Sequence, residues 1–140
     1  MPERIDEVMT ADVVSLAKDA SIRQAGEVMR DRDIGDVLIQ NEDGSLCGIV
    51  TDRDIVVRAI AEGLDPDSAS VEDVCEHDVV TLSSGDAIAR AVELMESHAI
   101  RRLPVVDNGQ VVGVVSIGDL AEHRDPKSAL GEISSAPPNN

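Results

Sequence analysis

The sequence contains no phenylalanine, tyrosine or tryptophan among its 140 residues. A hydrophobic core must therefore be built from aliphatic side chains and methionine, and the apolar share of 42% is sufficient for one. Without aromatic rings the chain cannot stack bases as the platforms for single-stranded nucleic acid do. This absence argues against one common class of nucleic-acid-binding protein and leaves a globular fold open.

Positive charge is also scarce, because 12 lysines and arginines stand against 28 acidic residues and the net charge is −16. Such a surface repels nucleic acid duplexes and anionic membranes, so we expect neither as a partner. No apolar run approaches the roughly 18 residues that a membrane span needs. The N-terminus lacks the apolar core of a signal peptide. We therefore expect a cytoplasmic protein.

Residues with reactive side chains are few and scattered. The cysteines, Cys47 and Cys75, do not correspond between the two halves of the chain, so we expect two free thiols rather than an inherited disulfide. Cys75-Glu76-His77 is too short a motif for a zinc site, and His98 and His123 supply no matching pair of ligands. No nucleophile–base pair recurs, and no phosphate-binding glycine loop is present. We expect no metal site, no catalytic residue, no required cofactor and no enzyme activity.

The chain does contain a long internal repeat. With a shift of 66 residues Ile5–Val8 falls on Val71–Val74, and after a one-residue gap Gly48 falls on Gly113. A self-match of this length indicates duplication of a whole supersecondary unit. The predicted boundaries are a first repeat at 3–63, a linker at 64–70, a second repeat at 71–123 and a flexible tail at 124–140.

Each repeat has the same predicted order of elements: an extended segment, a helix with one apolar face, a two-stranded hairpin and a short closing helix. Ser21 and Asp86 stand near the positions where the two main helices need an N-cap. Asn108-Gly109 between two valine-rich runs is a strong hairpin signal. The predicted hairpin strands are 37–40 with 46–51 and 103–107 with 110–116, and the closing helices are 52–62 and 117–123. One such unit exposes too much apolar surface to stand alone, so we expect a pseudo-twofold pair with two clefts.

A hydroxyl residue ends the second hairpin strand of each repeat, and an aspartate follows three residues later. These pairs are Thr51 with Asp54 and Ser116 with Asp119. The spacing is that of a capping box, although the usual acid there is the longer Glu or Gln, whose side chain reaches the N-cap amide. A carboxylate in this place also suits the two hydroxyls of a ribose, as in dinucleotide-binding folds. Capping and ribose binding both remain open, and they are compatible.

Arg101 and Arg102 form the only adjacent arginine pair in this acidic chain. Guanidinium groups bind phosphate through two parallel hydrogen bonds, so the pair is a candidate phosphate site. The alternative is a surface pair that offsets some of the acidic charge. Because Gly35 and Asp36 stand at the matching positions of the first repeat, only one of the expected clefts gains two cations.

Together these motifs resemble those of a cystathionine-β-synthase (CBS) domain. The resemblance rests on Val8-Met9-Thr10, on Gly-x-Val-Thr-x-x-Asp at 48–54 and on Arg-Arg-Leu-Pro-Val-Val-Asp at 101–107. It covers about residues 3–123 in two tandem copies, an arrangement called a Bateman module. It implies an α/β fold of the α+β type, with two β-α-β-β-α repeats packed as a pseudo-twofold pair.

The resemblance also implies a ligand. In the family, the hydroxyl and the aspartate of the closing motif hold the ribose of an adenine nucleotide, and residues before the middle strand line the adenine pocket. In kinase regulatory subunits of the family a His-Arg pair reaches the phosphates, and an arginine replaces that histidine here. The implied first cleft consists of Ile34, Gly35, Thr51, Asp54, Arg101 and Arg102. The implied second cleft consists of Ile100, Arg101, Ser116 and Asp119.

We therefore expect a regulatory module that senses AMP, ADP or ATP, with S-adenosylmethionine and NAD ranked after them. It would act on an unidentified effector protein through a ligand-dependent conformational shift. The resemblance further implies a homodimer formed through the helices. Two alternatives stay open: a ligand-free module for dimerisation or protein interaction, and a redox-responsive regulator that acts through Cys47 or Cys75.

Overall fold

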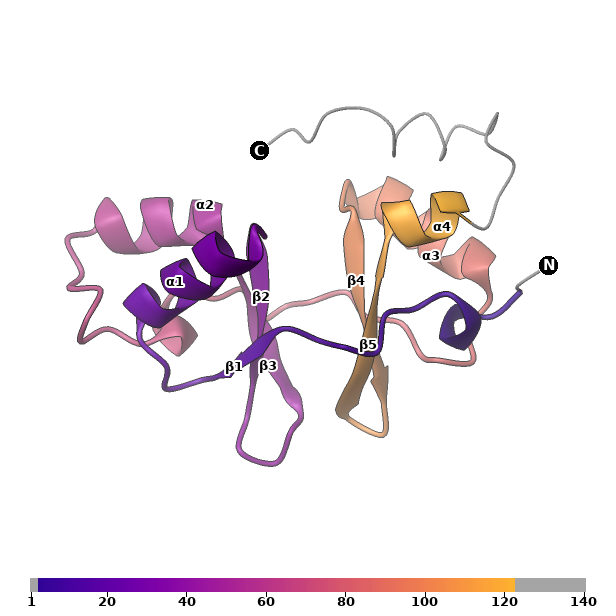
Figure 1. The fold of residues 1–140 in the computed structure, drawn as a ribbon, viewed down its shortest axis with the longest axis horizontal. Helices are drawn as coiled ribbons and strands as arrows, with labels where there is room; N and C mark the ends of the chain where they lie inside the picture. The colour runs from indigo at the N-terminus through magenta and orange to yellow at the C-terminus, as the bar shows by residue number, and fades with distance from the viewer. Residues whose placement is uncertain (1–2, 123–140) are drawn as a thin grey trace. The chain divides into compact units, whose positions relative to one another are not determined.

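The computed structural model describes residues 3–122, and the chain divides into two compact units (Figure 1). The first, here called the continuous unit, is Val14–Val79. The second, here called the split unit, joins the residues up to Val13 to those from Val80 onward. The residues that begin each predicted repeat, 3–13 and 71–79, are here called the leading segments. Each leading segment therefore belongs to the compact unit of the other repeat. The tail predicted at 124–140 and His123 lie outside the described residues.

The continuous unit contains a three-stranded sheet in the order β1-β2-β3. Strand β1 (Ser15–Ala17) is parallel to β2 (Asp36–Gln40), and β2 is antiparallel to β3 (Leu46–Thr51). Helices α1 (Ile22–Arg32) and α2 (Asp52–Asp54) cover one face of this sheet (Figure 1). Isolated bridge hydrogen bonds join Ile49 of β3 to Glu76, which places residues 75–77 beside that strand.

The split unit contains the hairpin of β4 (Arg102–Asp107) and β5 (Gln110–Ser116), with α3 (Ile88–His98) and α4 (Ile117–Glu122). Leu82 bridges β4 in parallel, and Thr10 bridges β5 in antiparallel fashion. The bridge of Thr10 to β5 is the counterpart of the bridge of Glu76 to β3. The two units thus repeat one arrangement, and the α+β fold class predicted from the sequence is confirmed.

The main helices begin and end by different means. Ser21 caps α1, because its Oγ accepts from the amide of Gln24 at 3.1 Å. The N-cap of α3 is Ala87, which directly follows Asp86, the residue predicted to stand near this position. The Asp86 carboxylate instead accepts from the amide of Ser83 at 2.8 Å and closes the turn before the helix. Both helices end in a left-handed residue, which is Asp33 in α1 and Ala99 in α3.

Both hairpins agree with the prediction to within one residue at each strand end. Asn108 and Gly109 have φ values of 52° and 80°, which a type I′ turn requires. The closing helix of the continuous unit differs from the expected regular helix, because α2 spans three residues and a π-helical turn follows at Ile55–Ile60. Turns of this kind often mark functional positions.

The core consists of two aliphatic clusters, one in each unit, as the lack of aromatic residues requires. In the continuous unit it includes Ile22, Met29, Ile39, Val50 and Val71, and in the split unit Ile5, Leu82, Leu103, Val115 and Leu120. The leading segments supply core residues across the repeat boundary, since Ile5 and Val71 are both fully buried.

None of the helices within residues 3–122 has the length and apolar character needed to cross a membrane.

Candidate functional site

Thr51 and Asp54 form a closed capping box at the start of α2. The Thr51 Oγ1 accepts from the Asp54 amide at 3.0 Å, and the Asp54 Oδ2 accepts from the Thr51 amide at 3.0 Å. Ser116 and Asp119 form the same pair of hydrogen bonds, at 3.1 Å and 2.9 Å. The shorter aspartate therefore reaches the N-cap amide, contrary to the reasoning that this needs Glu or Gln. Capping is one role of each motif, and it uses one carboxylate oxygen.

The other predicted residues of the continuous unit lie beside this motif. The carbonyl oxygen of Gly35 accepts from the Asp52 amide at 3.0 Å, and Asp36 is paired with Thr51 in the sheet. Ile34 is partly buried and packs against the core of the unit. Ile34, Gly35, Thr51 and Asp54 are thus gathered at one end of β2 and β3.

The split unit repeats this arrangement with different side chains. The carbonyl oxygen of Arg101 accepts from the Ile117 amide at 2.9 Å, and Arg102 is paired with Ser116. Ile100 packs against the core, while both arginine side chains are exposed. Ile100, Arg101, Ser116 and Asp119 are therefore gathered in one unit. Because Arg101 and Arg102 belong to the split unit, their assignment to the ligand of Thr51 and Asp54 stays a prediction.

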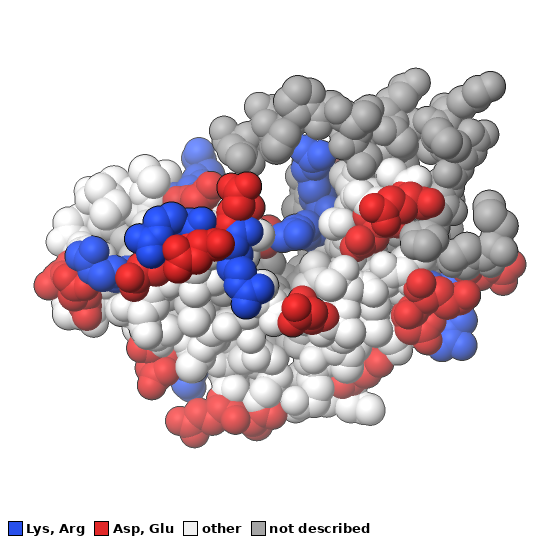
Figure 2. All heavy atoms as spheres, viewed as in Figure 1, with Lys and Arg blue, Asp and Glu red and all other residues white. Residues whose placement is uncertain are grey.

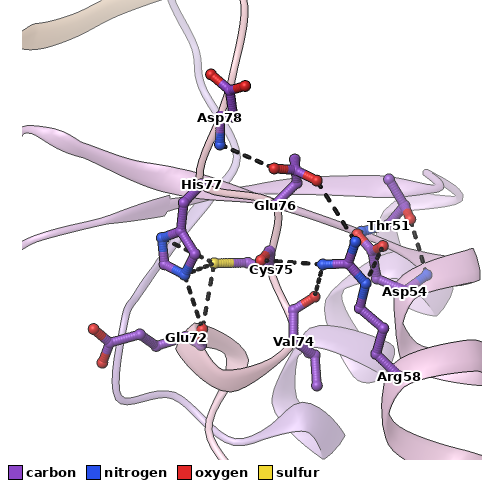
Figure 3. A network of polar contacts seen from close by, with 9 residues as sticks. All are labelled: Thr51, Asp54, Arg58, Glu72, Val74, Cys75, Glu76, His77 and Asp78. Carbon is purple, nitrogen blue, oxygen red and sulfur yellow. Dashed lines mark hydrogen bonds and ion pairs between the residues drawn. The ribbon is translucent and has the colours of Figure 1, made fainter.

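Arg58 connects the first motif to the segment after Val74, and the sequence reasoning did not identify it. Its Nε lies 3.8 Å from the Oδ1 of Asp54, and its Nη2 lies 3.6 Å from the Oε2 of Glu76 (Figure 3). Its Nη1 also donates to the carbonyl oxygens of Val74 and Cys75 at 3.4 and 3.5 Å. The i, i+4 spacing of Asp54 and Arg58 was the available signal.

Glu76 also holds the segment that follows it. Its Oε1 accepts from the amide of Asp78 at 3.0 Å (Figure 3). This hydrogen bond, together with the charge of Arg58, lowers the pKa of the Glu76 carboxyl. The side chain is therefore ionised at neutral pH, in the state that suits its contact with Arg58.

Cys47, Cys75 and His77 lie together at the edge of the continuous unit, with their potential ligand atoms within 4.8 Å of one another. The prediction of two free thiols is confirmed, with Cys47 half-buried and Cys75 buried. Burial raises the pKa of the Cys75 thiol to about 11, and the neighbouring Cys47 adds to this shift. A neutral, buried thiol is a slow nucleophile, which weighs against a redox-sensing role for Cys75.

The surface of the described residues carries many acidic side chains and one group of exposed apolar side chains. Figure 2 shows acidic side chains in separate groups over the visible face rather than in a single patch. Among residues 3–122 four large apolar side chains are exposed, and all lie on or just after the π-helical turn: Val56, Val57, Ile60 and Leu64. Their exposed fractions of 58%, 45%, 58% and 37% are high for a protein whose other large apolar residues within 3–122 are at least partly buried.

Two copies of an α+β unit, each with a capped hydroxyl–carboxylate motif after its hairpin, define a tandem-repeat protein. The chain belongs to the CBS domain family, which matches residues 5–60 and 71–125. The two matches account for the internal repeat and confirm the resemblance inferred from the motifs. Proteins made of such pairs are typically regulatory, ligand-binding modules.

Known proteins of similar sequence and structure include one from Mycobacterium tuberculosis, named hypoxic response protein 1. It is 33% identical over 130 residues, which cover 93% of this chain and 90% of that protein. A crystal structure of hypoxic response protein I with two coordinated zinc ions has a TM-score of 0.80 and 32% identity, covering 87% of this chain and 99% of that chain. The CBS domain pair of protein MJ0100, in complex with 5′-methylthioadenosine and S-adenosyl-L-methionine, has a TM-score of 0.74. That pair is 24% identical, with coverage of 87% and 96%, so it bears on the fold alone.

Proposed function

We propose that this protein is a regulatory module that binds an adenosine-containing ligand, with the ribose held by Thr51 and Asp54. The observation that carries the proposal is the fixed position of the Asp54 carboxylate. Its Oδ2 is held by the Thr51 amide, and its Oδ1 lies 3.8 Å from the Nε of Arg58. The side chain is 16% exposed, so a carboxylate of fixed orientation still reaches the surface. A ribose diol needs an acceptor of this kind.

Membership of the CBS family supports a ligand of this class, and AMP, ADP and ATP are the first candidates. The CBS domain pair of protein MJ0100, which shares this fold, holds 5′-methylthioadenosine and S-adenosyl-L-methionine, so the fold itself can accommodate a ligand that contains adenosine. The ligand would act by favouring one conformation of the module, which an effector protein then recognises. Even millimolar affinity corresponds to about −4.1 kcal/mol, which is enough to sense an abundant nucleotide.

The replacement Asp54→Asn tests ribose binding separately from capping. Asparagine keeps one accepting oxygen for the Thr51 amide but offers an NH₂ group where the second carboxylate oxygen stood. We expect calorimetry to give an AMP affinity at least about tenfold lower than that of the wild type, since hydrogen bonds to a charged group contribute about 1.5–3 kcal/mol. The melting temperature should change by less than about 3 °C, because the cap is kept.

Asp119→Asn is the matched control in the second motif. We expect it to leave the stronger AMP-binding event unchanged and to affect only a separate, weaker one. Unchanged AMP affinity in Asp54→Asn would show that the Thr51–Asp54 motif caps the helix but does not bind the ribose. Loss of the stronger event in Asp119→Asn would contradict the assignment of that event to Asp54.

Arg101 and Arg102 are proposed to bind the phosphate of the ligand. Guanidinium groups bind phosphate by bidentate hydrogen bonds, so replacing both with alanine should remove the preference for AMP over adenosine. Competition calorimetry with the two ligands measures this preference. A preference that survives in the double variant would place the phosphate-binding group elsewhere in the chain.

Self-association is a second proposed activity, favoured by the apolar patch of Val56, Val57, Ile60 and Leu64. An exposed apolar area on one helical segment is typical of an interaction surface. We expect light scattering to detect a homodimer that Val56→Glu with Ile60→Glu converts to a monomer. Ala89→Glu, at an exposed position of α3, should leave the dimer intact. A monomeric wild type at micromolar concentration would contradict this proposal.

A further inference from the structure

Three side chains with metal-binding atoms meet beside β3, although the sequence separates them. Cys47 lies on β3, whereas Cys75 and His77 belong to the segment that the bridge between Ile49 and Glu76 holds against that strand. The backbone hydrogen bonds of this bridge measure 3.0 and 2.8 Å. The sequence reasoning considered Cys75-Glu76-His77 alone and did not anticipate that Cys47 would supply a third ligand.

The distances between these atoms are close to those in a tetrahedral zinc site. With Zn–S bonds of about 2.3 Å and Zn–N bonds of about 2.0 Å, a sulfur and a nitrogen ligand lie about 3.5 Å apart. The Nδ1 of His77 lies 3.9 Å from the Sγ of Cys47 and 3.9 Å from the Sγ of Cys75. The same Nδ1 also lies 3.1 Å from the carbonyl oxygen of Cys47, so side-chain rotations that exchange this contact for a metal bond would bring all three atoms onto one ion.

The second nitrogen of His77 has a partner that suits a metal ligand. Its Nε2 lies 3.2 Å from the carbonyl oxygen of Glu72, to which it can donate while Nδ1 binds a metal (Figure 3). Ligating histidines almost always make such a hydrogen bond with their other nitrogen. The carboxylate of Glu72 points away from the cluster in Figure 3 and is not a ligand in this arrangement.

The backbone around the cluster is closely packed, which fixes the position of Cys75. A Cβ atom at Gly48 would lie 2.5 Å from the carbonyl oxygen of Glu76 and 2.9 Å from the Sγ of Cys75. The approach of the two segments thus depends on the glycine. A site held on paired backbone segments is more rigid than one on a free loop.

The split unit has the same backbone arrangement without these ligands. Val112, Met9 and Ala11 stand there in place of Cys47, Cys75 and His77. Met9 packs against Gly113 as Cys75 packs against Gly48. Packing at this position therefore requires neither a thiol pair nor an imidazole, so stability of the fold does not account for the presence of all three.

We propose that Cys47, Cys75 and His77 bind one Zn²⁺ ion, with water at the fourth coordination position. Two sulfur ligands and one imidazole are a donor set that selects zinc over magnesium or calcium. Three protein ligands leave the site open, because structural zinc sites use four. The ion would join β3 to the segment after Val74, the same segment that Arg58 contacts.

Cobalt titration of the reduced full-length protein tests the site. Co²⁺ bound by thiolates absorbs through ligand-to-metal charge transfer, and tetrahedral Co²⁺ has strong visible bands, so both signals should appear and saturate at one ion per chain. Zn²⁺ should then displace the Co²⁺ and remove both signals. Free thiols are counted in the same sample, so that an absent signal with both thiols reduced overturns the proposal.

The control variants take their residues from the split unit. Cys47→Val and His77→Ala introduce side chains that this backbone arrangement already contains, so both variants should fold. Each should lower the Co²⁺ affinity at least about tenfold, since losing even an outer partner of a ligand costs 10–100-fold. His98→Ala, at the exposed end of α3, should leave the affinity unchanged. Equal Co²⁺ affinity in wild type, Cys47→Val and His77→Ala contradicts the assigned ligands.

Discussion

The continuous and split units have the same hairpin, the same capping box and the same bridged leading segment, but they differ in the side chains placed on this frame. Asp54 of the continuous unit is followed by Arg58, which ties the motif to Glu76. In the split unit Asp119 keeps the cap, and Arg101 and Arg102 stand where the continuous unit has Gly35 and Asp36. The two units therefore share a backbone arrangement but carry different charged side chains around the capping motif.

The difference is greatest where the leading segment crosses the second hairpin strand. Cys75 and Met9 occupy equivalent places there, and each approaches a glycine of the strand. In the continuous unit a thiol pair and a histidine surround this point, whereas the split unit has only apolar side chains. The comparison indicates that the close approach of the two segments is part of the fold, whereas the two thiols and the imidazole are particular to the continuous unit.

The largest loss of stability is expected from replacing Gly48, which is compared with its counterpart Gly113. In Gly48→Ala the new methyl group meets the backbone oxygen of Glu76 at 2.5 Å, and this oxygen is fixed by the bridge to Ile49. In Gly113→Ala the nearest atom is the flexible Sδ of Met9 at 2.7 Å, with the oxygen of Thr10 at 3.0 Å. We expect Gly48→Ala to lower the free energy of unfolding by about 1–3 kcal/mol, and Gly113→Ala by less. Urea denaturation of both variants measures the difference in the free energy of unfolding. Equal losses would mean that the leading segment packs equally closely against the second hairpin strand in both units.

Replacing Arg58 should have a smaller effect. Arg58→Met keeps the aliphatic stem but removes the contacts to Asp54, Glu76 and the carbonyl oxygens of Val74 and Cys75. The side chain is 48% exposed, so we expect a loss of about 1 kcal/mol in the free energy of unfolding. Arg53→Met, at an exposed position of α2, is the control and should stay within about 0.5 kcal/mol of wild type. If Arg58→Met is as stable as this control, the contacts of Arg58 do not stabilise the continuous unit.

The smallest effect is expected from an ion pair that has no equivalent in the split unit. Arg23 of α1 binds Asp67 in the linker through two hydrogen bonds, while Ala89 stands at the matching position of α3. Both side chains are more than half exposed, at 56% and 60%. A double-mutant cycle with Arg23→Ala and Asp67→Ala should give a small coupling energy that decreases with added salt, because solvent screens an exposed pair. A larger, salt-independent coupling would show that the linker stabilises the continuous unit specifically.

Local signals were sufficient to predict most elements of the fold from the sequence. The Asn108-Gly109 turn and the Ser21 cap each depend on residues that are close in the chain, and the repeat follows from comparing the sequence with itself. The same is true of the capping boxes, whose aspartates were correctly identified as candidates for that role. The π-helical turn after α2 was missed, because its hydrogen-bond pattern leaves no distinct sequence signal.

Interactions between distant segments could not be predicted in the same way. The exchange of leading segments depends on which hairpin edge residues 71–79 pair with, and neither repeat encodes that choice locally. The grouping of Cys47 with Cys75 and His77 follows from this pairing, so it could not be read from ligand spacing. Arg58 is intermediate, since its contact with Asp54 is local whereas its contact with Glu76 is not.

The most direct test of ligand binding at the first motif is an amide NMR titration with AMP. The amides of Thr51 and Asp54 are the donors of one capping box, and those of Ser116 and Asp119 are the donors of the other, so four resonances report on both motifs. We predict saturable shifts at Thr51 and Asp54 at lower AMP concentration than any at Ser116 and Asp119. Resonances that stay unchanged at both motifs up to several millimolar AMP would contradict the proposed function.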